Sequence, residues 1–235
     1  MNNLDSSIVT WVNQLACKSQ VFDTTLFTIT HSHLLKGGVI IAIVWLSWFR
    51  RDKKQTVKRL HILATYVGCI AAIAIGRLAA FLLTFRARPM HDAEFYFFFP
   101  YGLEAGELGG WSSFPSDHAV LFFALVTGLS FASKRAGICA LLYTVVVILF
   151  PRLYFGYHYP TDIIAGAVIG AAIAVLSNTV LITRTRFTEL VNWTFSKPIF
   201  LYSGFIFLSF QIVEMFYSSR AVIRIVCRWF GILPA

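Results

Sequence analysis

Charged residues are scarce in this sequence. Only 13% of its 235 residues are Asp, Glu, Lys or Arg, 57% are hydrophobic, and the mean hydropathy is +0.71. A soluble domain of this size carries roughly a quarter charged residues on average. The deficit excludes a soluble globular domain, and several apolar runs approach the roughly 20 residues that cross a hydrocarbon core. The sequence therefore predicts a polytopic membrane protein.

Motifs for metals, nucleotides and disulfides are also missing. The cysteines are dispersed along the chain and are interpreted as small apolar residues: Cys17, Cys69, Cys139 and Cys227. The histidines are too scattered to form a ligand set, and neither a carboxylate-rich box nor a glycine-rich nucleotide loop occurs. We therefore expect neither a metal nor a cofactor. The N-terminus also lacks the basic start, apolar core and cleavage site of a signal peptide.

The formal net charge of +9 fits either a nucleic acid or an anionic membrane surface as partner. No basic stripe with interleaved aromatic residues occurs, so we expect no nucleic-acid partner. We expect contact with a bilayer that has anionic headgroups. Nothing in the sequence indicates an oligomeric state.

The apolar runs predict an all-α bundle of about six transmembrane helices. No linker or low-complexity segment divides the chain, so residues 1–235 are expected to form one domain. Apolar residues recur every three or four positions within residues 1–35, which predicts amphipathic helices in the membrane interface. A surface-packed leader without functional contact explains that pattern equally well. The predicted spans lie at about residues 36–49, 60–85, 115–134, 136–152, 160–183 and 198–218.

Cations predict the orientation of the bundle. The loop between the first two predicted spans holds six of them: Arg50, Arg51, Lys53, Lys54, Lys58 and Arg59. The positive-inside rule places this loop in the cytoplasm, so loops 86–114 and 152–160 face the exterior, or the periplasm of a Gram-negative bacterium. The C-terminal tail disagrees, since Arg220, Arg224 and Arg228 would lie outside. Their spacing of four residues suits an amphipathic helix that binds anionic headgroups.

Three segments at the ends of the predicted spans carry residues suited to phosphate chemistry. In the last of them, Asp162 follows His158 by four positions, so one helical turn brings carboxylate and imidazole together. A carboxylate on one ring nitrogen makes the other a better nucleophile or base. Arg152 offers a guanidinium fork for phosphate oxygens. An interfacial histidine with a local salt bridge is the alternative. Pro160 favours the first turn of the following helix.

The middle segment, Pro115-Ser116-Asp117-His118, opens the third predicted span. The free N–H groups of a helix start bind anions, Ser116 can donate to a phosphate oxygen, and His118 can transfer a proton. Ordinary helix capping is a strong alternative for Ser116. It explains His118 less well, because an ionisable group at the edge of an apolar span needs a partner.

The first segment ends the second predicted span at Arg88-Pro89. Pro89 biases Arg88 away from helix, which turns its guanidinium toward the other loops. Arg86 is interpreted as snorkelling to the headgroups. Arg77 lies three turns before Arg88, roughly 16 Å deeper along a straight helix, and inside a membrane it should have a partner.

These segments together resemble the signature of the type-2 phosphatidic acid phosphatase superfamily. The family pattern is Lys, six residues, Arg-Pro; then Pro-Ser-Gly-His; then Ser-Arg, five residues, His, three residues, Asp. The order and spacing of this pattern are matched by Arg88-Pro89, by Pro115 to His118, and by Arg152 with His158 and Asp162. The resemblance covers roughly residues 60–180, which we expect to be the catalytic core.

The sequence departs from the family pattern at three positions. Phe81 occupies the lysine position, Asp117 replaces glycine, and Pro151 replaces serine. These changes affect the predicted binding of the phosphate, and either Arg77 or Arg86 could supply the missing cation. They leave the two histidines and the aspartate intact.

The resemblance implies a metal-free, two-step phosphoryl transfer. His158, oriented by Asp162, would attack phosphorus to form a phosphohistidine, and His118 would protonate the leaving oxygen and then activate water. Arg88, Arg152 and Ser116, with Arg77 as a further candidate, would bind the phosphoryl oxygens.

The resemblance also implies a lipid substrate at the outer leaflet. Six-helix bacterial members with an outward site often hydrolyse undecaprenyl diphosphate to undecaprenyl phosphate, which is the activity we expect, in the inner membrane. Phosphatidylglycerol phosphate, phosphatidic acid and lipid A are competing substrates, and some members transfer phosphate to another lipid. A transporter and a non-catalytic lipid-binding protein are the alternatives of other classes.

Overall fold

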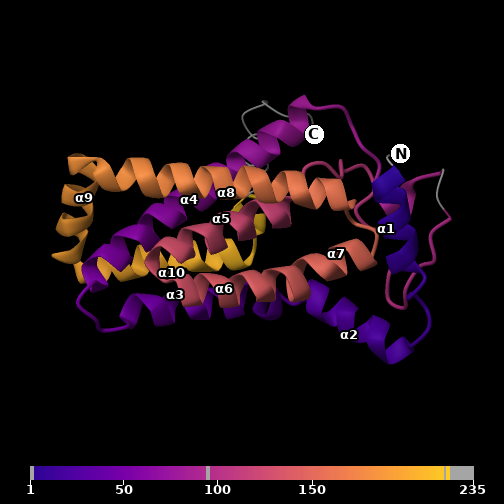
Figure 1. Cartoon of the computed structure of the whole chain (residues 1–235), viewed down its shortest axis with the longest axis horizontal. Helices are drawn as coiled ribbons and strands as arrows, with labels where there is room; N and C mark the ends of the chain where they lie inside the picture. The colour runs from indigo at the N-terminus through magenta and orange to yellow at the C-terminus, as the bar shows by residue number, and fades with distance from the viewer. Residues whose placement is uncertain (1–2, 94–95, 220, 223–235) are drawn as a thin grey trace.

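The computed structural model describes residues 3–93, 96–219 and 221–222, and within these ranges the protein contains helices and no strand (Figure 1). The predicted all-α fold is confirmed. The helices are α1 (Asn3–Asn13), α2 (Gln20–His31), η1 (Leu34–Gly38), α3 (Val39–Phe49), α4 (Gln55–Leu82), η2 (Pro89–His91), α5 (Asp117–Ala132), α6 (Lys134–Tyr143), η3 (Thr144–Leu149), α7 (Phe150–Tyr154), α8 (Pro160–Thr183), α9 (Thr185–Phe195) and α10 (Pro198–Val213).

Helices α4, α5 and α8 lie side by side and form the centre of the bundle (Figure 1). Small residues allow α5 and α8 to approach closely. A Cβ atom added to Gly170 would lie 2.1 Å from the carbonyl oxygen of Val120, and one added to Gly166 would lie 2.7 Å from that of Ser116. This close approach places the N-terminal ends of both helices together, and those ends carry the second and third predicted segments.

Three continuous helices are long and apolar enough to cross a membrane: Gln55–Leu82, Lys134–Tyr154 and Pro160–Thr183. Two further pairs qualify only as bent spans: α2 with Leu34–Phe49, bent by 70°, and Thr185–Trp193 with α10, bent by 108°. The described residues therefore provide three to five candidate spans, where the sequence predicted about six. The remaining predicted span is α5, whose 16 residues extend only about 24 Å.

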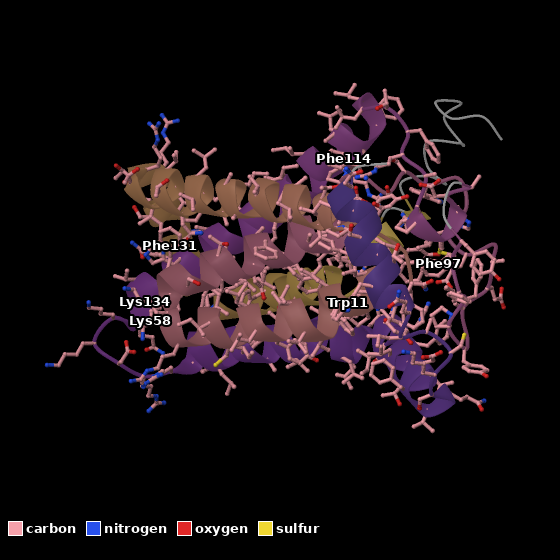
Figure 2. The ribbon with its side chains drawn as sticks, turned by 45° about the vertical axis from the view of Figure 1, so that its right-hand side comes forward. Trp11, Lys58, Phe97, Phe114, Phe131 and Lys134 are labelled. Carbon is pink, nitrogen blue, oxygen red and sulfur yellow. The ribbon has the colours of Figure 1, made fainter. Side chains whose placement is uncertain are left out.

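The N-terminal segment is helical, as expected, and forms α1 and α2, of which α1 packs against α7 and α8. Helix α1 lies across the ends of α7 and α8 (Figure 1). Its residues Val9 and Val12 are buried, and Asp5 is completely buried, whereas Trp11 is exposed (Figure 2). The buried carboxylate of α1 belongs to the candidate site described below, which favours a functional contact over a leader that only packs on the surface.

Labelled residues mark the two opposite ends of the bundle (Figure 2). Lys58 and Lys134 lie at one end, and Phe97 and Phe114 lie at the other, beside α1 (Figure 2). The cationic loops and the loops that carry the three segments therefore lie at opposite ends, as predicted. Which end faces outward stays a prediction. The predicted headgroup-binding tail with Arg220, Arg224, Cys227 and Arg228 lies outside the described residues.

Candidate active site

Arg88 reaches the site because α4 ends early. The helix ends at Leu82, and Arg88 has extended backbone angles (φ −77°, ψ 153°), as Pro89 predicts. Arg88 is buried, and its Nη1 donates to the carbonyl of Tyr157 at 2.6 Å. Its Nε–H is buried and has no hydrogen-bond partner. A buried guanidinium with a free donor is suited to bind an anion.

Arg152 lies in α7 with only 6% of its surface exposed. Its Nη2 lies 3.1 Å from the carbonyl oxygen of Thr30 and 2.9 Å from Nε2 of His118. Its Nε–H is also buried without a partner. Since a guanidinium only donates, Nε2 of His118 must be the acceptor, so this histidine is neutral and carries its proton on Nδ1.

His158 follows α7 and is almost completely buried. Its Nδ1 lies 2.8 Å from the carbonyl oxygen of Ser113, which can only accept, so Nδ1 carries the proton and Nε2 keeps its lone pair. Burial lowers the pKa of His158 well below its usual range, and the positive charge of Arg88 lowers that pKa further. His158 is therefore a neutral imidazole at pH 7, the form in which it can act as a nucleophile.

Asp162 is arranged differently from the prediction. Its Oδ2 lies 3.9 Å from Nδ1 of His158, so the direct hydrogen-bond partner of that ring is the Ser113 carbonyl. The carboxylate instead accepts from the backbone N–H of Tyr159 at 2.8 Å, which caps α8, and from Nη1 of Arg86 at 2.5 Å. Pro160 is the first residue of α8, as predicted.

Arg86 does not snorkel to the headgroups, so that interpretation is wrong. Its guanidinium bridges two completely buried carboxylates, since Nη1 donates to Asp162 and Nη2 donates to Asp5 at 2.6 Å. Asp5 also accepts from the backbone N–H of Thr161 at 3.0 Å and from its hydroxyl at 2.6 Å. The sequence contains no signal for Asp5, because an acidic residue in a first helical turn is explained by the helix dipole alone.

Arg77 has the partner that its position in an apolar helix requires, because it forms an ion pair with Asp117 and lies 5.3 Å from the ring centre of Trp111. The depth predicted for Arg77 relied on a straight helix as far as Arg88, and this is wrong because α4 ends at Leu82. Phe81 is 85% exposed and points away from the bundle. Because both arginines form ion pairs with carboxylates, neither Arg77 nor Arg86 is available to bind phosphate in place of the lysine of the family pattern.

Ser116 is the N-cap of α5. Its side chain accepts from the backbone N–H of Ala119 at 3.5 Å, and its own N–H donates to the carbonyl of Asp162 at 3.2 Å. The capping alternative is thus confirmed, and the hydroxyl proton remains free to donate. Within the part of the chain that the structure describes, no group of three His, Cys, Asp or Glu side chains is placed to hold a metal ion.

The chain is similar to known bacterial proteins. Undecaprenyl-diphosphatase BcrC of Bacillus subtilis (strain 168) is 25% identical over 165 residues, which cover 70% of this chain and 78% of that protein. The bacitracin transport permease protein BcrC of Bacillus licheniformis is 38% identical over 64 residues, or 27% of this chain and 31% of that protein. No solved structure is significantly similar.

The matched family covers the three segments. Residues 81–186 match the family described as the PAP2 superfamily, and this range contains Arg88, His118, Arg152, His158 and Asp162. It also contains α5, α7 and α8, the elements that position these side chains. The three segments of the candidate site therefore lie within the region that matches the PAP2 superfamily.

Proposed function

We propose that this protein hydrolyses a lipid diphosphate without a metal ion, through a phosphohistidine at His158. The observation that carries the proposal is the neutral imidazole of His158 beside the unpartnered Nε–H groups of two buried arginines, Arg88 and Arg152. A nucleophile and two free cationic donors in one buried cluster are the components that phosphoryl transfer requires.

In the first step, Nε2 of His158 attacks the terminal phosphorus and forms an N–P bond while the P–O bond to the leaving group breaks. The leaving oxygen keeps the electron pair and takes a proton from His118. Once substrate oxygens replace Nε2 of His118 as the acceptor for Arg152, this nitrogen takes up that proton from water, and it becomes neutral again when it donates the proton. In the second step, His118 removes a proton from water, the water attacks phosphorus, and inorganic phosphate leaves as His158 is regenerated.

The surrounding groups orient the nucleophile and stabilise charge. The Ser113 carbonyl fixes the tautomer of His158, and Asp162 holds the start of α8 through its bond to the Tyr159 N–H. Arg88, Arg152 and the hydroxyl of Ser116 bind the phosphoryl oxygens and stabilise the charge that develops on them. Arg77 contributes through Asp117 and does not bind phosphate directly in this proposal.

Undecaprenyl diphosphate is the proposed substrate, with undecaprenyl phosphate as product. The name of the Bacillus subtilis relative supports this choice, as does the position of the site at the end of apolar helices, where a membrane lipid can reach it. We place the protein in the inner membrane of a bacterium with the site facing outward, because the cationic loop lies at the opposite end.

Phosphate release by the purified protein tests the proposal. The panel contains undecaprenyl diphosphate, phosphatidylglycerol phosphate, phosphatidic acid and lipid A, each with a chelator present. We expect wild-type protein to release phosphate from undecaprenyl diphosphate. H158A that elutes as a folded protein should release none. Binding without release would favour a lipid-binding protein. Solute flux in liposomes would favour a transporter, for which the name of the Bacillus licheniformis relative is the supporting observation.

A further inference from the structure

The candidate site has more positive charge than its carboxylates neutralise. Arg77 pairs with Asp117, and Arg86 pairs with Asp5 and Asp162. The other cations around the two histidines are Arg88, Arg152 and Lys36, and none of these three forms an ion pair within the described ranges. Uncompensated cations inside a membrane protein are costly, so they indicate an anionic ligand.

Lys36 belongs to neither the family motif nor residues 81–186. It lies in η1, a π-helical turn that begins the helix Leu34–Phe49, and this helix is bent by 70° relative to α2 at the break just before η1. Neighbouring contacts fix this turn: Tyr143 donates to the carbonyl of Leu35 at 2.6 Å, and Gly37 packs so closely on Val213 that a Cβ would lie 2.7 Å from its Cα. Short π-helical turns inside helices frequently occur at functional sites.

The same turn adjoins the catalytic cluster. The carbonyl of Thr30, at the end of α2, accepts a hydrogen bond from Arg152, and η1 packs against η3, the segment that leads into α7. The half-buried ammonium of Lys36 interacts electrostatically with Arg152 and with His118. Lys36 therefore lies on the side of the site that holds the proposed general acid.

We propose that Lys36 binds the leaving phosphate of a diphosphate substrate, and so takes over the positive charge that Phe81 cannot supply. The inference rests on the proposed function, because it assigns His158 to the terminal phosphorus and His118 to the leaving oxygen. When the bond from the bridging oxygen to the terminal phosphorus breaks, the electron pair stays on that oxygen. Lys36 then stabilises the lipid monophosphate that departs.

The number of cations agrees with a diphosphate. A phosphate monoester carries about −1.5 to −2 at pH 7, and a second phosphoryl group adds another ionised oxygen. Arg88 and Arg152 are sufficient for one phosphoryl group. A third free cation, on the leaving-group side, is required only when that group also carries a phosphate. Lys36 therefore determines the preference for diphosphates over monophosphates.

Two substrates with one prenyl chain test this assignment: farnesyl diphosphate and farnesyl phosphate. We expect K36Q to lower kcat/KM for the diphosphate by about tenfold or more, the loss of one charge-assisted contact, and for the monophosphate by less than about threefold. K36R should recover most of the diphosphate activity. K36M is a second neutral variant with an apolar stem, and K53Q, at the cationic end, is the matched control and should equal wild type on both substrates.

Two results would contradict the phosphate subsite at Lys36 without contradicting the proposed hydrolase: an equal loss of kcat/KM on both substrates, or full activity on the diphosphate in folded K36Q and K36M. A wild-type protein that releases phosphate from neither substrate would overturn the proposed function and the subsite together. Competition by methylenediphosphonate gives an independent measurement. Its inhibition constant should rise about tenfold in K36Q, whereas inhibition by inorganic phosphate should stay unchanged.

Discussion

Replacing Asp5 by alanine tests whether α1 positions the catalytic end of the bundle. The carboxylate is completely buried and accepts hydrogen bonds from the Thr161 N–H (3.0 Å), the Thr161 hydroxyl (2.6 Å) and Arg86 Nη2 (2.6 Å). Breaking a fully buried ion pair costs about 3–5 kcal/mol. The Arg86 side chain is 29% exposed, so water replaces part of the contact, and we expect a loss of about 2–3 kcal/mol in stability.

The same change should reduce activity beyond its effect on stability. Arg86 bonds to Asp162, and Asp162 caps the helix that follows His158. Because a displacement of about 1 Å can lower a rate by about 100-fold, we expect kcat/KM of folded D5A to fall by about 10- to 100-fold. Thermal unfolding in detergent measures the first effect, and phosphate release normalised to folded protein measures the second.

Asp23 provides the matched control. It is also completely buried and accepts from the N–H groups of Cys17 (3.1 Å) and Tyr101 (3.0 Å) and from the Tyr154 hydroxyl, but it does not bond to Arg86. D23A should lower the unfolding temperature to a similar extent while folded protein keeps kcat/KM within about threefold of wild type. An unchanged kcat/KM in D5A, or an equal loss in D23A, would refute the positioning role.

Four further predictions concern pH, packing and phosphate binding. The lowered pKa of His158 places the acid limb of the pH profile of kcat/KM below pH ~6.5, the usual histidine value. R88Q should move that limb to higher pH, because it removes a positive charge that lowers this pKa. A limb that moves to lower pH contradicts the assignment. The same shift makes the folded state lose stability as pH falls below ~6.5, and H158Q should lose less in a pH series of thermal unfolding. G170V should destabilise the bundle by several kcal/mol, since a Cβ there meets the Val120 carbonyl oxygen at 2.1 Å, and an unchanged unfolding temperature would disprove that packing. R152Q should reduce kcat/KM for phosphate release by about 100-fold or more, because it removes a transition-state contact and the hydrogen-bond partner of His118. Near-normal activity of R152Q would exclude a role of Arg152 in binding the phosphoryl group.

Local features of the site were predictable because short-range backbone effects determine them. Pro89 keeps Arg88 extended, Pro160 begins α8, and Ser116 caps α5. Each depends on residues that lie within one helical turn. The three segments could therefore be placed at element ends before their arrangement in space was known.

Long-range contacts of the site were not predictable. Arg86 and Asp5 are 81 residues apart, and His158 and Ser113 are 45 residues apart. No periodicity or motif relates residues at such separations, and a backbone carbonyl partner such as that of Ser113 has no side-chain signature. The sequence pattern thus predicted a contact between His158 and Asp162, whose spacing of one helical turn is visible, and missed the Ser113 carbonyl that lies closer.

The bundle was also only partly predictable. Hydropathy identified α4 and α8, but it gave no indication of the 70° bend between α2 and the helix that begins at Leu34, or of the π-helical turn that contains Lys36. Hydropathy reports the length of an apolar run and is insensitive to a break within it. The proposed role of Lys36 depends on contacts of this turn with distant segments, so it could only be proposed from the structure.

Trapping the covalent intermediate tests the central claim most directly. Wild-type protein is mixed with labelled farnesyl diphosphate, quenched within one turnover, and analysed by peptide mass spectrometry. We predict a phosphoryl group on His158, which is absent from H158A and accumulates in H118A as its hydrolysis slows. Turnover without any phosphorylated histidine, or a phosphoryl group on His118 instead, would contradict the account.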